Sequence, residues 1–527
     1  MMSLILALLP IVLLIWMMTK KNGVPSYIAL PFTAALVTAL QIFYFQTDLT
    51  LLGANIVSGS LAAITPISII AGAILMNRMM CLSGAEKTIS NWLEGISSNK
   101  VAQLMIIGWA FAFMIEGASG FGTPAAIAAP ILVGLGFNPL KVAMLALVMN
   151  SVPVSFGAVG TPTWFGFSGL GFDDAGLLEI GRQTALVHFV AALVIPVIAL
   201  RFVVSWNEIR RNYFFILFSI LSCTVPYFLI AQWNYEFPSL VGGAIGLSLS
   251  IMFAKMNLGL NKADSNGSKT DHNIAPAVLF KAMLPTILLI VILIVTRIKQ
   301  LGIKSMLTDA TEMLSVSLGS LGDFSISQAL IFKLSNIFGT NVAWAYKTLY
   351  VPALIPFLLV VLISIPLLKL KGSMVKQVFT ETGSRIKMPF ITLIGALIMV
   401  KMMMVGGENS PILIIGMAFS DFMGTNWQYA ASYLGALGAF FSGSATVSNL
   451  TFGGIQQTIA MTVGLPETTT LALQSVGGAM GNMVCINNII AVSTILGISN
   501  QEGYIIKRTV IPMIVYGMIA AVMSTLL

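Results

Sequence analysis

The stretch "EGASGFGTPAAIAAP" (116–130) interrupts one of the most apolar regions of this sequence. It follows fifteen residues without a charge, Val101–Ile115, and brings together Glu116, three glycines and two prolines. Glycine and proline disfavour the interior of a helix, because glycine is too flexible and proline lacks a backbone N–H. A carboxylate beside such helix breakers, within an apolar region, needs an explanation from the surrounding sequence.

The composition of the 527-residue chain is that of a membrane protein. Hydrophobic residues make up 57% and charged residues 9%, and the mean hydropathy is +0.94. A soluble domain cannot cover its surface with so few charges. Apolar runs of about 20 residues predict membrane-spanning helices, which satisfy their backbone hydrogen bonds within one segment. The predicted fold class is an all-α polytopic membrane protein in contact with the lipid bilayer.

The net charge of +8 does not indicate a nucleic-acid partner. Lysines and arginines in the loops of a membrane protein set its topology, and this explains the excess. We expect no cleavable signal peptide, because Lys20 and Lys21 follow the first apolar run instead of preceding it. The scattered cysteines predict no disulfide framework and are expected to be small buried residues: Cys81, Cys223 and Cys485.

About twelve apolar spans follow one another along the chain, at 3–19, 24–45, 51–77, 142–168, 181–200, 212–231, 238–254, 281–296, 348–368, 388–405, 466–497 and 508–526. Four further apolar arms are too short to cross a membrane at about 1.5 Å per residue. These arms are Val101–Ile115, Pro124–Phe137, Trp427–Phe441 and Leu450–Val463. They form two pairs around small polar tips, which predicts re-entrant hairpins over 101–137 and 427–463. Four tilted ordinary spans are the alternative.

The positive-inside rule orients this arrangement with both termini outside. Twenty of the 27 basic residues then lie in cytoplasmic loops: Lys20, Lys21, Arg78, Lys87, Lys100, Lys141, Arg201, Arg210, Arg211, Lys255, Lys262, Lys269, Lys281, Lys369, Lys371, Lys376, Arg385, Lys387, Lys507 and Arg508. The acidic "GFDDAGLLE" (171–179) falls outside. Charge does not distinguish hairpins from four full spans, whereas the length of the arms favours hairpins.

The two halves of the sequence resemble each other. After the first tip comes a long span interrupted by "NSVPVSFGAVGTP" (150–162), and after the second a long span interrupted by "QSVGGAMGNMVCINN" (474–488). The first hairpin is expected to enter from the cytoplasm and the second from outside. Two repeats of inverted topology are typical of secondary transporters. We predict an N-terminal half (1–256), a cytoplasmic linker (257–275) and a C-terminal half (276–527).

Tips and broken helices expose backbone N–H groups, and helix N-termini carry partial positive charge, so both suit an anion. The side chains there are mostly hydroxyls and amides, which suit a small anionic solute, although small residues also simply allow close helix packing. The predicted substrate-binding residues are Ser119, Thr123, Asn150, Ser151, Ser155, Thr161, Arg182, Ser444, Thr446, Ser448, Asn449, Gln474, Asn482 and Asn487.

Few ionisable groups lie at membrane depth. Arg182 could pair with a substrate carboxylate, extend to the outer interface, or pair with Asp173 or Asp174. His188 could relay protons or be a satisfied buried histidine. Burying an ionised carboxylate is costly, so Glu116 beside its tip is expected to carry the coupled proton, unless a backbone donor or Arg182 pairs with it.

Several of these motifs resemble those of the bacterial lactate permease family. They are "EGASGFGTPAAIAAPILVGLGFNPL" (116–140), "NSVPVSFGAVGTP" (150–162), "GRQ" (181–183), "GSATVSNLTFGGIQ" (443–456) and "LALQSVGGAMGNMVCINNIIAV" (471–492). The resemblance implies symport of a 2-hydroxy monocarboxylate, lactate or glycolate, with a proton across the bacterial inner membrane. Some family members carry "GSDT" where this chain has "GSAT" (443–446), which leaves Glu116 as the acidic residue at the tips.

Other functions are less well supported by the sequence. The absence of a Gly-Lys dipeptide disfavours an ATP-driven pump, and no motif suggests an enzyme, a metal site or a cofactor. Sodium coupling stays open, because hairpin carbonyls also hold Na⁺, and so does a passive anion channel. The segment 298–347 is amphipathic and predicted to lie outside, without a functional interpretation.

Overall fold

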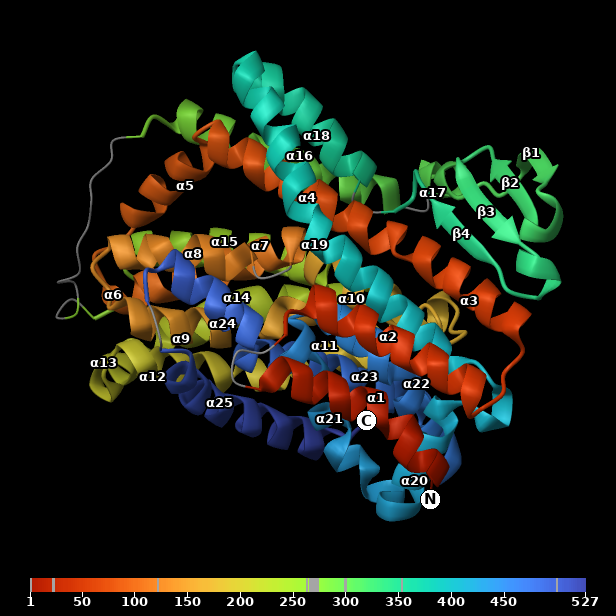
Figure 1. Ribbon diagram of the computed structural model, residues 1–527. Coiled ribbons are helices and arrows are strands. Elements are labelled where there is room, and N and C mark those ends of the chain that lie inside the picture. Colours follow the sequence, from red (N-terminus) through yellow and green to blue (C-terminus); the bar gives the residue numbers. More distant parts are fainter. Residues whose placement is uncertain are drawn as a thin grey trace. The chain divides into compact units, whose positions relative to one another are not determined.

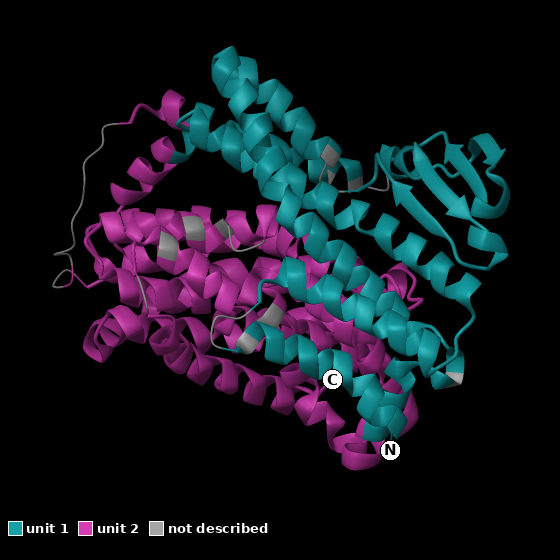
Figure 2. Cartoon of the chain, in the orientation of Figure 1, with its two compact units in different colours: residues 1–86, 280–418 teal, residues 87–279, 419–527 magenta. Residues whose placement is uncertain are grey.

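The structure is a computed structural model, and it describes residues 2–20, 24–120, 123–261, 264, 274–297, 301–351, 354–498 and 501–527. Most of these residues are helical (Figure 1). The chain divides into two compact units, residues 1–86 with 280–418 and residues 87–279 with 419–527 (Figure 2). Each unit takes one segment from each predicted half. The units therefore differ from the halves of the sequence, and the inverted repeat stays a prediction.

The first unit is built around long apolar helices. Helix α19 packs against α2, α3 and α4, and α18 packs against α4. A Cβ added to Gly395 of α19 would meet the backbone of Leu30 and Pro31 of α2, so glycine allows the two helices to approach closely. The helices of this unit are α1 (Met2–Thr19), α2 (Ser26–Phe43), α3 (Leu49–Ala62), α4 (Ile64–Leu82), most of α16 (Pro276–Arg297), α17 (Ile303–Leu307), α18 (Leu354–Leu367), α19 (Gly372–Met404) and most of α20 (Pro411–Met423).

The first unit also contains a β-sheet, so the all-α prediction was wrong for this segment. Four antiparallel strands follow in the order β1 (Glu312–Ser317), β2 (Asp323–Ser327), β3 (Ile331–Ser335) and β4 (Trp344–Lys347). Polar and apolar residues alternate in β2 with the period of a strand, whereas all six residues of β1 are exposed. Figure 1 shows the sheet beside α3, and the apolar contacts of Leu334 and Ile337 with Ala54 hold it there.

The second unit holds both predicted hairpins and both predicted broken spans. Its helices are α5 (Ala85–Glu94, from residue 87), α6 (Lys100–Gln103), η1 (Leu104–Phe111), α7 (Ala112–Ser119), α8 (Thr123–Gly134), α9 (Pro139–Met149), η2 (Val152–Phe156), α10 (Gly157–Trp164), α11 (Asp174–Ala192), α12 (Ile195–Val203), α13 (Trp206–Arg211), α14 (Tyr213–Ala231), α15 (Pro238–Lys255), α21 (Trp427–Ser442), α22 (Ala445–Val463), α23 (Glu467–Gly481), η9 (Asn482–Val484), α24 (Ile486–Ile495) and α25 (Glu502–Met523). Two pairs are bent, α9 with η2 and α10 by 46° and α11 with α12 by 40°.

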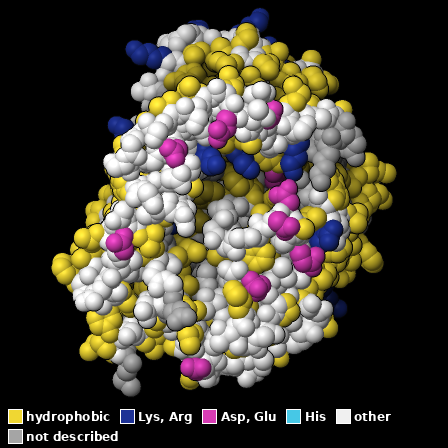
Figure 3. Space-filling model, turned by 90° about the vertical axis from the view of Figure 1, so that its right-hand side faces the viewer, with side chains coloured by type: hydrophobic (Ala, Val, Ile, Leu, Met, Phe, Trp, Pro, Cys, Tyr) yellow, Lys and Arg dark blue, Asp and Glu magenta, His cyan; other side chains and the backbone are white. Residues whose placement is uncertain are grey.

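The membrane character that the composition predicts is confirmed. Within the described residues, nine helices are long and apolar enough to cross a membrane, or up to eleven if each bent pair counts as one span. Each of the twelve predicted spans overlaps a helical segment, two of which, Met2–Met18 and Ile355–Leu367, are shorter apolar helices of 10–17 residues. Figure 3 shows large hydrophobic areas on the surface of one face, beside scattered acidic and basic side chains.

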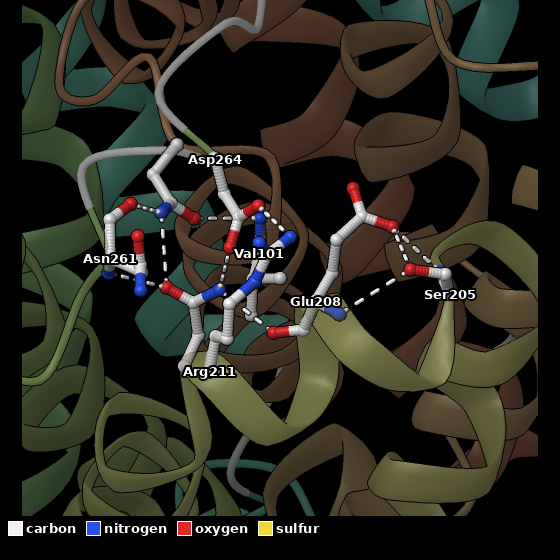
Figure 4. A network of polar contacts seen from close by, with 8 residues as sticks. Val101, Ser205, Glu208, Arg211, Asn261 and Asp264 are labelled. Carbon is white, nitrogen blue, oxygen red and sulfur yellow. Dashed lines mark hydrogen bonds and ion pairs between the residues drawn. The ribbon is translucent and has the colours of Figure 1, made fainter.

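A polar network fixes the start of the first hairpin (Figure 4). The Asn99 side chain caps α6 by accepting hydrogen bonds from the N–H groups of Val101 (2.9 Å) and Ala102 (3.1 Å). Its amide N–H donates to Oδ1 of Asn212 at 3.1 Å. Asn212 in turn donates to the buried carboxylate of Asp264 at 2.8 Å. The network thereby ties α6, α13 and the beginning of the linker together.

Helix α13, beside this network, begins with a capping box. The hydroxyl and backbone N–H of Ser205 donate to the Glu208 carboxylate, each at 2.7 Å. Partial burial acts to raise the pKa of Glu208, but the bonds from Ser205 and the nearby charges of Lys100 and Arg211 lower it below its ordinary value. Arg211 also forms an ion pair of 2.7 Å with Asp264. The cytoplasmic end predicted for this unit is thus held by charge-assisted bonds.

Candidate functional site

The first arm of the first hairpin is longer than the sequence analysis predicted. A continuous helix runs over Lys100–Ser119, 20 residues that are long and apolar enough to cross a membrane, so the expectation of an arm too short to cross was wrong. Its middle part, Leu104–Phe111, is a π-helix, a rare form that is frequent at functional sites. The helix ends at Gly120, whose φ of +59° favours glycine. Residues 121–122 of the tip lie outside the described residues.

Glu116 lies in the last turn of α7 and is 3% exposed. Its Oε2 accepts a hydrogen bond of 3.1 Å from the Asn150 side chain, at the end of α9. A Cβ added to Gly157 would lie 3.2 Å from the carboxyl carbon of Glu116 and still closer to Oε1. The absence of a side chain at Gly157 therefore provides the space that the carboxylate occupies.

The first broken span lies where the sequence analysis predicts it. Helix α9 ends at Met149, and Ala158, Val159 and Gly160 take φ values of 44°, 56° and 70°. Left-handed backbone is costly for a β-branched residue such as Val159, and such strain concentrates at functional sites. Side chains satisfy the carbonyls that the break releases: Tyr227 donates to Val152 (3.4 Å), Ser239 to Pro153 (2.6 Å), Thr163 to Ser155 (3.1 Å) and Trp164 to Val159 (3.1 Å).

The second hairpin turns at Gly443, with a φ of +71°. Ser444 then caps α22 by accepting a hydrogen bond of 3.3 Å from the N–H of Val447. The N–H groups of Ala445 and Thr446 open this 19-residue helix, where the helix offers them no carbonyl. The second break is narrower than predicted. Helix α23 continues to Gly481, and the chain leaves the α-helix only over residues 482–485.

Both tips and both breaks line one cleft within the second unit. The cleft contains about 280 Å³ of empty space, part of it open to solvent. Because part of this volume is open solvent, the enclosed space is smaller still. Its lining residues are Glu116, Gly120, Val154, Gly157, Ala158, Pro162, Gly443, Ser444, Ala445, Thr446 and Asn482.

The charge distribution of the cleft is simple. Among the described lining residues only Glu116 is ionisable, and none of them is a lysine or arginine. The N-terminus of α22 supplies partial positive charge and two backbone donors. Ser444, Thr446 and Asn482 add hydroxyl and amide groups. The cleft can therefore bind a small anion and hold one exchangeable proton.

Three predicted ligands lie instead in a buried network behind the second tip. Ser448 donates to the carbonyl of Gly435 at 2.6 Å and accepts from Gln474 at 3.0 Å. Asn449 donates to the carbonyl of Pro162 at 2.9 Å. Gln474 also accepts a hydrogen bond of 2.9 Å from Gln456. These side chains join α21, α22, α23 and α10, and the cleft lining does not include them.

His188, the second predicted proton carrier, is fully buried away from the cleft lining. Its Nε2 lies 2.8 Å from Oγ of Ser155, and its Nδ1 is hydrogen-bonded to the Tyr516 hydroxyl. The Ser155 hydroxyl donates to the carbonyl of Ser475 at 3.1 Å and accepts a hydrogen bond of 3.0 Å from the Ser475 hydroxyl. Both ring nitrogens thus have partners, an arrangement that suits the alternative of a satisfied buried histidine.

Five further predicted ligands lie outside the described lining of the cleft. Three hydroxyls bond to carbonyls of nearby residues: Ser119 to Ile115 (3.0 Å), Ser151 to Val148 (2.7 Å) and Thr161 to Ala158 (2.5 Å). Arg182, two turns into α11, donates to the Gln232 carbonyl at 2.9 and 2.7 Å and forms a 3.5 Å ion pair with Glu179, not with Asp173 or Asp174. Asn487 is exposed on α24. The side chain of Thr123 lies outside the described residues.

Four of the lining residues, Glu116, Ser444, Thr446 and Asn482, were predicted from the sequence, whereas the apolar ones were not. Val154, Ala158, Pro162 and Ala445 all lie in the motifs of the tips and breaks. A search for polar ligands passes over them, because alanine, valine and proline carry no hydrogen-bonding side chain. The apolar lining residues could have been predicted from their position, because each lies in or beside a tip or a break of a helix.

A family model described as L-lactate permease matches residues 3–527. The chain belongs to the L-lactate permease family. A Haemophilus influenzae protein provisionally named as an L-lactate permease is 60% identical over 522 residues, covering 99% of this chain and 98% of that protein. The glycolate permease GlcA of Escherichia coli is 23% identical, and the alignment covers 99% of this chain and 95% of that protein. MtrF of Neisseria gonorrhoeae, from a class of antimetabolite efflux pumps, aligns with 94% of this chain and 83% of its own at a TM-score of 0.33 and 13% identity, too low to support an argument.

Membership of this family has two direct consequences. The protein is a transporter and not an enzyme, as the sequence analysis expects. Together with the apolar helices, the family identifies it as a multi-pass membrane protein. The cleft is therefore a candidate for a transport site.

The buried position of Ser448 leads to a prediction about stability. Ser448→Ala removes the donor to Gly435 and the acceptor for Gln474. Leaving buried polar groups unsatisfied costs about 1–3 kcal/mol. We expect a lower unfolding temperature in detergent with an unchanged apparent KM. Thr451→Ala is the matched control, because this hydroxyl of the same helix bonds only to its own helix carbonyl, Val447. A raised KM at unchanged stability would instead make Ser448 a substrate ligand.

The contact between Gly157 and Glu116 leads to a second prediction. A methyl group in Gly157→Ala must displace the carboxylate. Overpacking of this kind costs about 1–3 kcal/mol, and where that cost falls on substrate binding we expect uptake at low substrate concentration to fall roughly 5- to 150-fold. Gly169→Ala is the control, because an added Cβ there meets no atom within 4 Å. Equal uptake in the two variants would show that the position of Glu116 is unimportant.

Proposed function

We propose that the protein imports lactate, or a related 2-hydroxy monocarboxylate such as glycolate, together with a proton. The observation that carries this proposal is that Glu116 and the N-terminus of α22 line the same small cleft. The family supports the substrate class, since its members include proteins named L-lactate permease and glycolate permease. The described lining contains no lysine or arginine, so the carboxylate of the substrate must be bound by neutral hydrogen-bond donors.

The N-terminus of α22 provides such donors. Two backbone N–H groups, those of Ala445 and Thr446, start a helix of 19 residues, whose dipole favours negative charge at this end. The hydroxyl of Thr446 and the amide of Asn482 lie in the same lining and can bond to the 2-hydroxyl group. We place the substrate carboxylate at the helix terminus and the hydroxyl toward Asn482.

Glu116 couples a proton to this anion by electrostatic repulsion. Two ionised carboxylates that share one cleft repel each other, so the substrate anion binds best when Glu116 is protonated. Glu116 is only 3% exposed, and burial also favours its protonated form, because an ionised carboxylate loses its hydration there. Moving one elementary charge against 100 mV costs about 2.3 kcal/mol, and co-transport of a proton removes that cost.

The contacts of the first break favour a proton over a sodium ion. Sodium sites in broken helices use unwound carbonyls. Here Tyr227, Ser239 and Thr163 already donate to the carbonyls of the first break. Glu116, by contrast, has a single hydrogen bond to its carboxylate in the described part of the chain, that from Asn150.

The remaining architecture of this proposal follows secondary transporters. The two helix–turn–helix pairs are re-entrant hairpins in this proposal, because one arm of each pair is short: α8 has 12 residues and α21 has 16. They belong to two inverted repeats that alternate access to a site at the membrane midplane. We place the protein in the bacterial inner membrane with both termini outside, because that orientation puts most basic loops in the cytoplasm.

Replacing Glu116 tests the coupling. Glu116→Gln keeps the shape of the protonated side chain but cannot release a proton. In proteoliposomes we expect it to abolish lactate accumulation driven by an imposed pH gradient while sparing exchange of labelled for unlabelled lactate. Glu467→Gln, a carboxylate of the second unit outside the cleft lining, should leave both activities intact. If Glu116→Gln still accumulates lactate, another residue carries the proton, and His188 is the next residue to replace. If uptake by the wild type requires sodium, the coupled ion is sodium and not a proton.

Cysteine labelling tests the orientation. We expect an impermeant thiol reagent applied to intact cells to label Asp174→Cys and Met313→Cys, which are exposed and predicted to lie outside, but not the exposed Lys376→Cys. Glu236 is unsuitable for this purpose because it is only 6% exposed. The background should carry Cys81→Ser, since Cys81 is exposed. Labelling at position 376 in intact cells would reverse the proposed topology.

A further inference from the structure

The cleft has an apolar side that the binding of a carboxylate does not use. Val154, Ala158, Pro162 and Ala445 contribute apolar atoms to its lining. Val154 comes from the first break and Ala445 from the second tip, and each is only 2% exposed. The two side chains pack together with Ala479 of α23 in one small cluster. This cluster closes the apolar side of the cleft.

The space around Ala445 is restricted from behind. A Cβ added to Gly478 of α23 would lie 3.2 Å from the Cβ of Ala445, so α23 is already in close contact there. Ala479, the next residue of α23, is fully buried against the same side chain. A larger side chain at position 445 has no room toward α23 and must extend into the cleft.

The names of the relatives indicate what this apolar side could select. Lactate carries a methyl group on C2, whereas glycolate carries a hydrogen atom there, and the two acids are otherwise alike. Both names occur among the proteins similar to this chain. A hydrophobic pocket distinguishes substrates that differ by one methylene group by roughly 10- to 200-fold. One or two apolar contacts are therefore enough to distinguish lactate from glycolate, which differ by one methyl group.

We propose that Val154 and Ala445 determine substrate specificity by limiting the size of the C2 substituent. This inference rests on the proposed transport of 2-hydroxy monocarboxylates. With the carboxylate at the N-terminus of α22 and the hydroxyl toward Asn482, the C2 substituent faces the side chains of Val154 and Ala445. Valine at 154 and alanine at 445 leave space for a methyl group and exclude longer chains.

Uptake of three labelled acids tests the proposal: glycolate, L-lactate and L-2-hydroxybutyrate, which carry a hydrogen, a methyl and an ethyl group on C2. Val154→Ala enlarges the apolar side, so the ratio of 2-hydroxybutyrate to lactate uptake should rise roughly tenfold or more. Ala445→Val reduces it, so the ratio of glycolate to lactate uptake should rise by a similar factor. Ratios within one variant do not depend on how much protein reaches the membrane.

Val152→Ala is the matched control. Val152 belongs to the same short helix as Val154 and is fully buried, but it does not line the cleft. Its ratios should equal those of the wild type. Wild-type ratios in both Val154→Ala and Ala445→Val would overturn the proposal while leaving lactate transport intact. If the wild-type protein itself transports neither lactate nor glycolate, the proposed function fails instead.

Discussion

The structure of the second unit depends on satisfying backbone groups where helices are broken. Within a membrane, an unpaired carbonyl or N–H costs several kcal/mol, because no water is present to bond to it. At the first break, hydroxyls from α14, α15 and α10 take up the released carbonyls. At the second tip, Ser444 satisfies the third N–H of α22. Most polar side chains near these points therefore serve the backbone, and few remain for a substrate.

This division explains which parts of the site can be predicted from sequence. Glycine, proline and small polar residues mark tips and breaks directly, and the structure places all four features around one cleft. A hydroxyl in the same motif carries no sign of whether it faces the cleft or a carbonyl. Ser444 and Ser448 stand one helical turn apart, yet the first lines the cleft and the second bonds to Gly435. Only the packing of α21 against α22 decides between them.

Two further differences have similar causes. The helix around Glu116 continues to Ser119, and its carboxylate finds a partner in Asn150 and space beside Gly157, contacts from distant segments. The sheet over 312–347 was missed because the hydrophobic composition favoured helices throughout, although β2 alternates polar and apolar residues with a period of two. Membrane composition thus predicts the spans well, and it hides a small β-structure between them.

The two tips are similar in position and different in chemistry. The first contributes a carboxylate, Glu116, at the C-terminal end of a helix, where the partial negative charge of the helix adds to the cost of ionisation. The second contributes Ala445 and Thr446 at the N-terminal end of a helix, where an anion is stabilised. Helix polarity alone thus favours a proton on the first tip and an anion at the second. Both tips line one small cleft, so under the proposed symport a proton on Glu116 and an anion at α22 would each stabilise the other, which is the thermodynamic requirement for moving them together.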